Sequence, residues 1–394
     1  MKRVIAASTI VVVVALTTAF SASPGLASPG VPTGLVRAIH AHLGAGNVRF
    51  ASGTAQRPEA GFGYSVALSA DGTTALVGAP GVAGFTGAAY VFHTSDAGSW
   101  VTNSTPTVTL TDGAASDPEA LGLDVALSAD GTTAFVGAPG GAGGRGAIYV
   151  YRASSEDAWA SSSAPTATLS VSRGFYVGET FAVSPDGTTL LVGAPAYDSF
   201  SGGAYVFHAA SEAAWASTST PNAILSNIAE PSNDDAVGAS VAISGDGTTA
   251  LLSDGYVNNG TGGAYVFHVA SESSWASSTS PTAILTDSAS SANDFLGYGV
   301  ALSGDGTTAV LGAPGVNGNT GAVELFQVPS ESAWATTSTP AATLSNAGGS
   351  QDDFLGLLVA VSSDGATVVA GAPGDGSSAG AAYIFHSASE ISWT

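Results

Sequence analysis

The chain has 394 residues, of which 30 are Asp or Glu and only 8 are Lys or Arg, so its formal net charge is -22. This balance argues against nucleic acids and anionic membranes as partners, because phosphate-rich surfaces are bound by clustered Lys and Arg. The absence of cysteine excludes disulfides, thiol catalysis and Cys-ligated zinc. The acidity is typical of a soluble surface, and an acidic binding face is the alternative interpretation.

Residues 1–27 have the pattern of a secretory signal peptide. Lys2 and Arg3 precede an apolar run over residues 4–16, and small residues follow up to Ala27. The run is shorter than the roughly 20 residues that a membrane-spanning helix needs, so no membrane insertion is expected. We therefore expect a secreted, extracellular protein. Residues 28–47 form an N-terminal segment in which LVRAIHAHLG predicts a short helix.

The remainder, residues 48–394, is dominated by one phrase that occurs six times. It begins as SADGTTALVGAP at Ser69 and returns with the same Asp-Gly pair at intervals of 56 to 60 residues. The aspartates of the six copies are Asp71, Asp130, Asp186, Asp246, Asp305 and Asp364.

Each copy contains four short apolar runs separated by turn signals, as in LGYGVALS, TTAVLGAP, GAVELFQ and AATLS of the fifth copy. Runs of this length, rich in Val, Leu, Ala and aromatic residues, favour strands. Asp-Gly between the first two runs predicts a hairpin. In the second run, apolar residues occupy both the odd and the even positions, which point to opposite faces of a sheet. This indicates a strand buried on both faces. We therefore predict an all-β protein, a β-propeller of six four-stranded blades.

The two chain ends predict how the ring closes. Residues 48–50 have the spacing of a lone fourth strand before the first copy, while the chain stops at Thr394 before a fourth strand of its own. The first strand can therefore complete the last blade and remove the open sheet edges. A seven-blade-like or incomplete ring is the alternative.

Two residue types recur at fixed places and are interpreted as structural. A ring of tryptophans could offer stacking platforms for sugars, but equal spacing in all copies favours a packing anchor. Histidines end the third run in four copies, and a residue that recurs at a fixed place in a repeat indicates a structural role. The tryptophans are Trp100, Trp159, Trp215, Trp275, Trp334 and Trp393, and the histidines are His93, His208, His268 and His386.

The stretch from Phe62 to His93 resembles the FG-GAP repeat of integrin-α-like propellers, closest to its bacterial secreted branch. Phe62-Gly63 and Gly78-Ala79-Pro80 stand for the two elements that name the repeat. The resemblance extends over residues 48–394 and implies the propeller fold, while a propeller hosts many functions. Two departures, Val177-Gly178 in the third copy and Ser253-Asp254-Gly255 in the fourth, predict irregular geometry there.

The resemblance also raises the question of calcium, which integrin-type repeats often bind in the first hairpin through several carboxylates. In the first copy Ala67, Ser69 and Ala75 occupy the flanking ligand positions around Asp71, and the other copies are equivalent. One carboxylate per hairpin is too few, so we expect metal-free hairpins and no cofactor. Calcium on the loops of the opposite rim is the remaining alternative.

The candidate ligand-binding residues are acids in the loops between fourth and first strands, which should share one rim with the Gly-rich loops after GAP. The alternative is a solvated rim. We predict a non-catalytic binding or adhesion scaffold for an extracellular protein or a glycan. One rival is a secreted carbohydrate-active hydrolase or lyase that uses scattered acids such as Asp124, Glu179 and Glu324, and another is a structural surface protein. The candidate rim acids are Asp117, Glu119, Asp234, Asp235, Asp294, Asp352 and Asp353.

Overall fold

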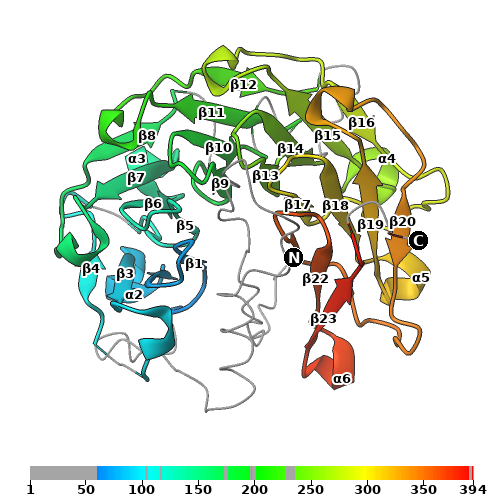
Figure 1. The fold of residues 1–394 in the computed structure, drawn as a ribbon, viewed down its shortest axis with the longest axis horizontal. Coiled ribbons are helices and arrows are strands. Elements are labelled where there is room, and N and C mark those ends of the chain that lie inside the picture. Colours follow the sequence, from blue (N-terminus) through cyan, green and yellow to red (C-terminus); the bar gives the residue numbers. More distant parts are fainter. Residues whose placement is uncertain are drawn as a thin grey trace.

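The computed structural model describes residues 60–102, 105–115, 118–172, 176–195, 197, 201–227, 236–389 and 393. These residues form six antiparallel sheets that follow one another around an arc (Figure 1). Five sheets have four strands in chain order and the last has three. The predicted all-β, six-bladed fold is confirmed. The predicted signal peptide, the short helix and the closing strand at residues 48–50 lie outside the described residues.

The strands of a blade run from the inner to the outer edge of each sheet. Blade 1 contains β1 (Val66–Leu68), β2 (Thr74–Ala79), β3 (Ala88–His93) and β4 (Val108–Leu110); blade 2 contains β5 (Val125–Leu127), β6 (Thr133–Ala138), β7 (Ala147–Arg152) and β8 (Ala167–Ser170). Blade 3 contains β9 (Phe181–Val183), β10 (Thr189–Gly193), β11 (Ala204–His208) and β12 (Ala223–Leu225); blade 4 contains β13 (Val241–Ile243), β14 (Thr249–Ser253), β15 (Ala264–His268) and β16 (Ala283–Leu285). Blade 5 contains β17 (Val300–Leu302), β18 (Thr308–Ala313), β19 (Ala322–Gln327) and β20 (Ala342–Leu344), and blade 6 contains β21 (Val359–Val361), β22 (Thr367–Ala372) and β23 (Ala381–His386).

Two kinds of short turn connect the strands. One kind lies between the second and third strands and contains left-handed backbone, as at Ala83 with a φ of 53° and Gly84 with a φ of 74°, and the other is a 3-10 turn immediately before the recurring tryptophan. The first kind comprises α2 (Val82–Phe85), α3 (Gly141–Gly144), α4 (Val257–Gly260), α5 (Val316–Asn319) and α6 (Asp375–Ser378). The second comprises η1 (Ala97–Ser99), η2 (Glu156–Ala158), η3 (Glu212–Ala214), η4 (Glu272–Ser274) and η5 (Glu331–Ala333).

The Asp-Gly hairpins owe their shape to short hydrogen bonds around the aspartate. In blade 1 the Ser69 hydroxyl and the Thr73 amide donate to Asp71 Oδ1 at 2.7 and 3.0 Å. Gly72 adopts a φ of +74°, a conformation that glycine reaches without strain. The aspartate therefore acts as a turn former, as its place in the sequence predicts.

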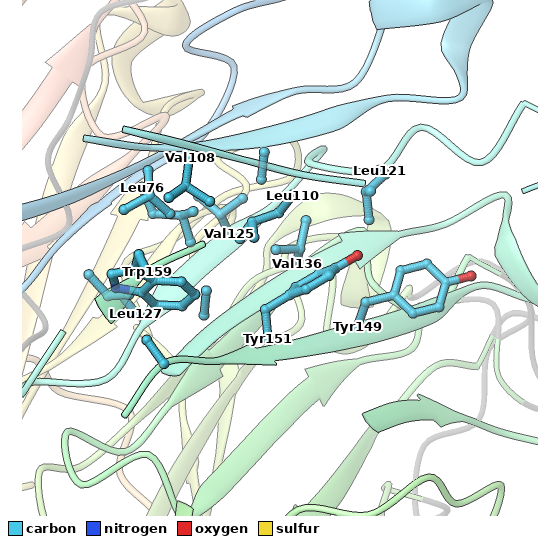
Figure 2. Close-up of a cluster of buried hydrophobic side chains, with 14 of the residues drawn as sticks. Leu76, Val108, Leu110, Leu121, Val125, Leu127, Val136, Tyr149, Tyr151 and Trp159 are labelled. Atoms are coloured by element: carbon cyan, nitrogen blue, oxygen red, sulfur yellow. The ribbon is translucent and has the colours of Figure 1, made fainter. Parts of the chain in front are cut away.

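The recurring tryptophan closes the same hairpin from the other side. Trp100 Nε1 donates to Gly72 O at 2.8 Å, and the equivalent bond recurs in all six copies at 2.8 to 2.9 Å. The third-strand histidine is also structural, since His93 Nδ1 lies 2.9 Å from Thr74 Oγ1. Figure 2 shows Trp159 at one end of an apolar cluster between blades 1 and 2, with the Tyr149 and Tyr151 hydroxyls directed away from it. The tryptophan ring is a packing anchor.

Neighbouring blades approach through the two glycines of the repeat motif. A Cβ on Gly78 would lie 2.0 Å from Gly122 O, and a Cβ on Gly122 would lie 2.4 Å from Ala88 O. Neither position can therefore carry a side chain without moving the backbone of the next blade. Equivalent approaches of 1.8 to 2.1 Å join Gly137 to Gly178, Gly193 to Gly238 and Gly312 to Gly356.

The two departures from the motif leave this arrangement largely in place. Val177 forms the same parallel bridge to Gly146 that Leu121 forms to Gly87, so the irregularity predicted for blade 3 is not found at this contact. In blade 4 Ser253 replaces the glycine, and its hydroxyl accepts a hydrogen bond from the Ser240 amide at 2.8 Å. The hydroxyl that replaces the glycine is accommodated because it takes part in a hydrogen bond within its own sheet.

A glutamate side chain of one blade accepts hydrogen bonds from two threonines in the Asp-Gly hairpin of the preceding blade. Glu156 of blade 2 accepts hydrogen bonds from the Thr73 and Thr74 hydroxyls of blade 1 at 3.0 and 2.7 Å. A Cβ on Gly131 would lie 1.9 Å from the same carboxylate, so the hairpin glycine also makes room for it. Glu212, Glu272 and Glu331 repeat this contact on the threonine pairs of blades 2, 3 and 4.

We expect the Glu272→Ala variant to lose about 2 kcal/mol in free energy of unfolding, because hydrogen bonds to a charged group contribute about 1.5–3 kcal/mol. Thr188 and Thr189 would lose their shared acceptor. Urea denaturation measures the change, with Ser273→Ala on the exposed side of the same turn as the control. Equal stability of the two variants would contradict a role for the glutamate in joining blades.

The junction between blades 6 and 1 differs from the other five. No described atom lies within 4 Å of a Cβ built on Gly63, whereas its counterpart Gly122 is in tight contact. Ala97 replaces the blade-joining glutamate in blade 1, and Ala366 replaces the first threonine in blade 6. Along β23 burial alternates, and Ile384 is 68% exposed at a position that is buried in the other blades. Closure by residues 48–50 stays a prediction.

Closure can be tested by matched deletions. Removing residues 28–55 should lower the melting temperature strongly, because β23 would lack its fourth-strand partner and both sheet edges would stay open. Removing residues 28–44 leaves the predicted strand intact and should have little effect. Identical melting curves for the two deletions would contradict closure by the N-terminal strand.

Candidate functional site

The loops between fourth and first strands share one rim with the loops between second and third strands, as predicted. The Gly140 amide donates to Glu119 O at 2.9 Å, and the equivalent bonds reach Asp294 O and Asp353 O at 3.0 and 3.1 Å. We call this edge of the blades, which carries Glu119, Asp294, Asp352 and Asp353, the acidic rim. The Asp-Gly hairpins lie on the opposite edge.

Three of the candidate acids share one position in the repeat. Asp117, Asp234 and Asp235 lie outside the described residues. Glu119, Asp294 and Asp353 occupy equivalent positions, each two residues before the apolar residue of the FG-like turn. The backbone places all three of them beside the glycine that opens the next loop. Counting back from the FG-like residue could have revealed the register.

Each described acid of the rim accepts a hydrogen bond from a nearby side chain or backbone amide. Glu119 is 8% exposed, and its Oε2 accepts a hydrogen bond from the Tyr149 hydroxyl at 3.2 Å. Asp294 and Asp353 each accept a backbone amide three residues earlier in the chain, at 2.6 Å in both loops. Asp352 is exposed and accepts from Asn319 Nδ2 at 2.8 Å. Of these four, Asp352 is the acid most open to a ligand.

A tyrosine at one position of the third strand supplies donors to this rim in three blades. Tyr149 donates to Glu119, Tyr265 donates to Asp254, and Tyr383 donates to Asp375. Burial, reinforced by the charges of Glu119 and Asp112, raises the pKa of Tyr149 far above its ordinary value, so its hydroxyl remains a donor. In these three blades a phenol hydroxyl therefore donates a hydrogen bond to an acid of this rim.

Blade 5 breaks this pattern, because Glu324 stands in β19 where the other blades have tyrosine. Glu324 is 3% exposed, and Oε2 has no hydrogen-bond partner in the described structure. Burial, followed by the charges of Asp287 and Asp294, raises the pKa of Glu324 to about 8. Glu324 is therefore buried within the electrostatic influence of two aspartates, without the hydroxyl donor that blades 2, 4 and 6 provide.

An exposed aromatic pair at blades 4 and 5 escaped the sequence analysis. Tyr256 and Tyr298 are 43% and 39% exposed, with ring centroids 6.4 Å apart. Phe295 supports them, since its ring centroid lies 5.7 Å from that of Tyr256. Tyr256 occupies a position that is glycine in four other copies, directly after the Ser253-Asp254-Gly255 departure. That departure was the available signal, because the residue directly after it is aromatic where four other copies have glycine.

Asp124, one of the acids considered for catalysis, links three blades. Its Oδ1 accepts from the Ser65 hydroxyl and the Val125 amide at 3.0 and 2.9 Å, and its Oδ2 accepts from the Phe181 amide at 3.0 Å. Burial raises the pKa of Asp124 to about 6, against the opposing effect of these hydrogen bonds. This arrangement is suited to joining inner strands. Glu179, the neighbouring acid of the same hypothesis, is exposed.

We expect Asp124 to make stability depend on pH. Because its folded pKa is raised, its contribution is fully present below about pH 4 and is lost as pH rises through about 6. The Asp124→Ser variant carries the residue of Ser65 and Ser240 at the equivalent positions. Between pH 4 and 7 the wild type should therefore lose on the order of 2–3 kcal/mol of unfolding free energy relative to this variant. Parallel pH profiles in urea denaturation would contradict the assignment.

The comparisons with known proteins support the repeat and the fold. Residues 56–92 and 279–326 match the family model described as FG-GAP repeat. No curated protein matches the chain. Among solved structures, the hydrazine synthase of Kuenenia stuttgartiensis is similar with a TM-score of 0.53 and 15% identity, over 82% of this chain and 83% of that chain. The Dos1 propeller is similar with a TM-score of 0.50 and 10% identity, over 84% of this chain and 71% of that chain. At these identities the likeness concerns the fold alone.

Proposed function

This chain is an FG-GAP repeat protein with a propeller fold, and on that basis we propose that it is a secreted, non-catalytic binding scaffold. Its ligand contacts lie on the acidic rim, at the junction of blades 4 and 5. The observation that carries the proposal is the exposed pair Tyr256 and Tyr298, two aromatic rings that lie close together across the junction of blades 4 and 5. Residues that build blades recur in every copy, whereas a ligand site on a repeat protein is carried by the features that differ.

The chemistry of this junction favours a glycan as the ligand. Exposed tyrosine rings offer flat apolar faces for the C–H groups of a sugar, and their hydroxyls can bond to sugar hydroxyls. The neighbouring carboxylates accept hydrogen bonds from sugar hydroxyl or amino groups. The net charge of -22 disfavours acidic polysaccharides, so we propose a neutral or amino-containing glycan.

An extracellular location rests on the signal-peptide pattern of residues 1–27, which lie outside the described part of the chain. In the part that the structure describes, no helix is long and apolar enough to cross a membrane. Secretion is tested by expressing the full chain with and without residues 1–27 and comparing the amounts in the culture medium.

The binding proposal predicts that the Tyr256→Ala and Tyr298→Ala variants each weaken glycan binding by about tenfold or more, as loss of a central aromatic contact does. The measurement is a panel of neutral, amino-containing and acidic glycans, with calorimetry on those that bind. Tyr64→Ala is the matched control, because Tyr64 occupies the position of Tyr298 in blade 1 and is 52% exposed there.

Three outcomes would contradict this proposal. Binding that survives both substitutions, or that falls equally in Tyr64→Ala, would place the ligand elsewhere. Retention of an extracellular protein instead of any glycan would change the ligand class. Turnover of a glycosidic substrate that is abolished by Glu179→Gln or Asp124→Asn would favour the carbohydrate-active hydrolase or lyase.

A further inference from the structure

The rim of blade 5 is chemically unlike the equivalent rim of the other blades. At one position of the third strand the other five copies have tyrosine, and blade 5 alone has Glu324. Where tyrosine is present in blades 2, 4 and 6, its hydroxyl donates to a carboxylate. Blade 5 therefore has a carboxyl group at the position where the other blades have a neutral hydroxyl donor.

The strands on either side of Glu324 carry no charged group, and the charged groups that face it are both acids. In register it lies between Leu311 of β18 and Thr343 of β20, and neither of these strands contains a titratable residue. The groups that face it are Asp287 and Asp294, both from the loop between β16 and β17. One oxygen of each aspartate is held by a backbone amide, from Ala289 at 2.9 Å and from Ser291 at 2.6 Å.

The equivalent side chains in blade 6 are in direct contact, which indicates that those of Asp287 and Glu324 lie close together in blade 5. Asn346, which corresponds to Asp287, donates through Nδ2 to the Tyr383 hydroxyl at 2.7 Å. In blade 5 both partners of that contact are carboxyl groups, so the same approach brings together two acids that cannot both ionise without a compensating positive charge. A buried carboxylate oxygen without a donor costs free energy unless a positive charge or a proton compensates it.

We propose that Glu324 and Asp287, with Asp294 beside them, bind a divalent cation of the calcium type on the rim of blade 5. Carboxylate oxygens are the ligands that calcium prefers, and a doubly charged ion compensates the pair directly. The described residues contain no ready-made group of three His, Asp or Glu ligands. Two carboxylates therefore bind the ion, and water completes its shell.

Such a partly hydrated site should be weak, with a dissociation constant on the order of 10⁻⁴–10⁻³ M, the range of extracellular calcium modules. It is distinct from the Asp-Gly hairpins on the opposite edge. There the carboxylate already accepts hydrogen bonds from its own turn, as Asp305 does from the Ser303 hydroxyl at 2.5 Å and the Thr307 amide at 3.2 Å.

The test is the melting temperature of the full chain during a calcium chloride titration, with sodium chloride at matched ionic strength as the reference. At about ten times the dissociation constant, calcium should raise the melting temperature by roughly 2–4 °C.

The decisive variant is Glu324→Tyr, which installs the residue found in the other blades, and Glu324→Gln is the second variant should the first fold poorly. Both should abolish the calcium-specific shift. Asp305→Asn, in the hairpin of the same blade, should retain it. The proposal is overturned if calcium and sodium chloride act alike on the wild type, which would show that the pair holds only a proton. It is also overturned if the calcium shift persists in both Glu324 variants or disappears in Asp305→Asn.

Discussion

The close approach of two backbones at paired glycines is the constraint on which the arc of blades depends. Gly122 O lies where the side chain of Gly78 would be, and Leu121 forms a parallel bridge to Gly87 in the same place. The two elements that name the repeat are thus the two halves of one contact between neighbouring blades. This explains why both halves recur in the sequence although each is only two or three residues long.

The remaining repeated residues reinforce that contact from the hairpin edge. The tryptophan holds the hairpin of its own blade, and the glutamate three residues before it holds the threonines of the preceding blade. Four of the five described outer strands are also bridged by the next blade, as in the parallel bridge between Leu110 and Ser162. Covering outer strands in this way protects sheet edges that would otherwise pair with other chains. The repeat is therefore explained by packing, without reference to a ligand.

Chemistry concentrates where copies depart from the repeat. Blade 4 replaces GAP by Ser253-Asp254-Gly255 and adds Tyr256, while blade 5 replaces a tyrosine by Glu324. Both changes fall on the same rim and on adjacent blades. The first change is tolerated because the Ser253 hydroxyl accepts a hydrogen bond within its own sheet.

The sequence by itself determined the all-β class, the six copies, the Asp-Gly turns and the structural tryptophans, because each depends on local turn chemistry repeated at a constant interval. It also excluded a hairpin rich in carboxylates. Only the tertiary structure decided that Asp124 joins three blades. It likewise brought Tyr256 beside Tyr298 and Asp287 beside Glu324. These contacts join residues from different strands, loops and blades, and their distances depend on how neighbouring sheets pack, which no local pattern in the chain encodes.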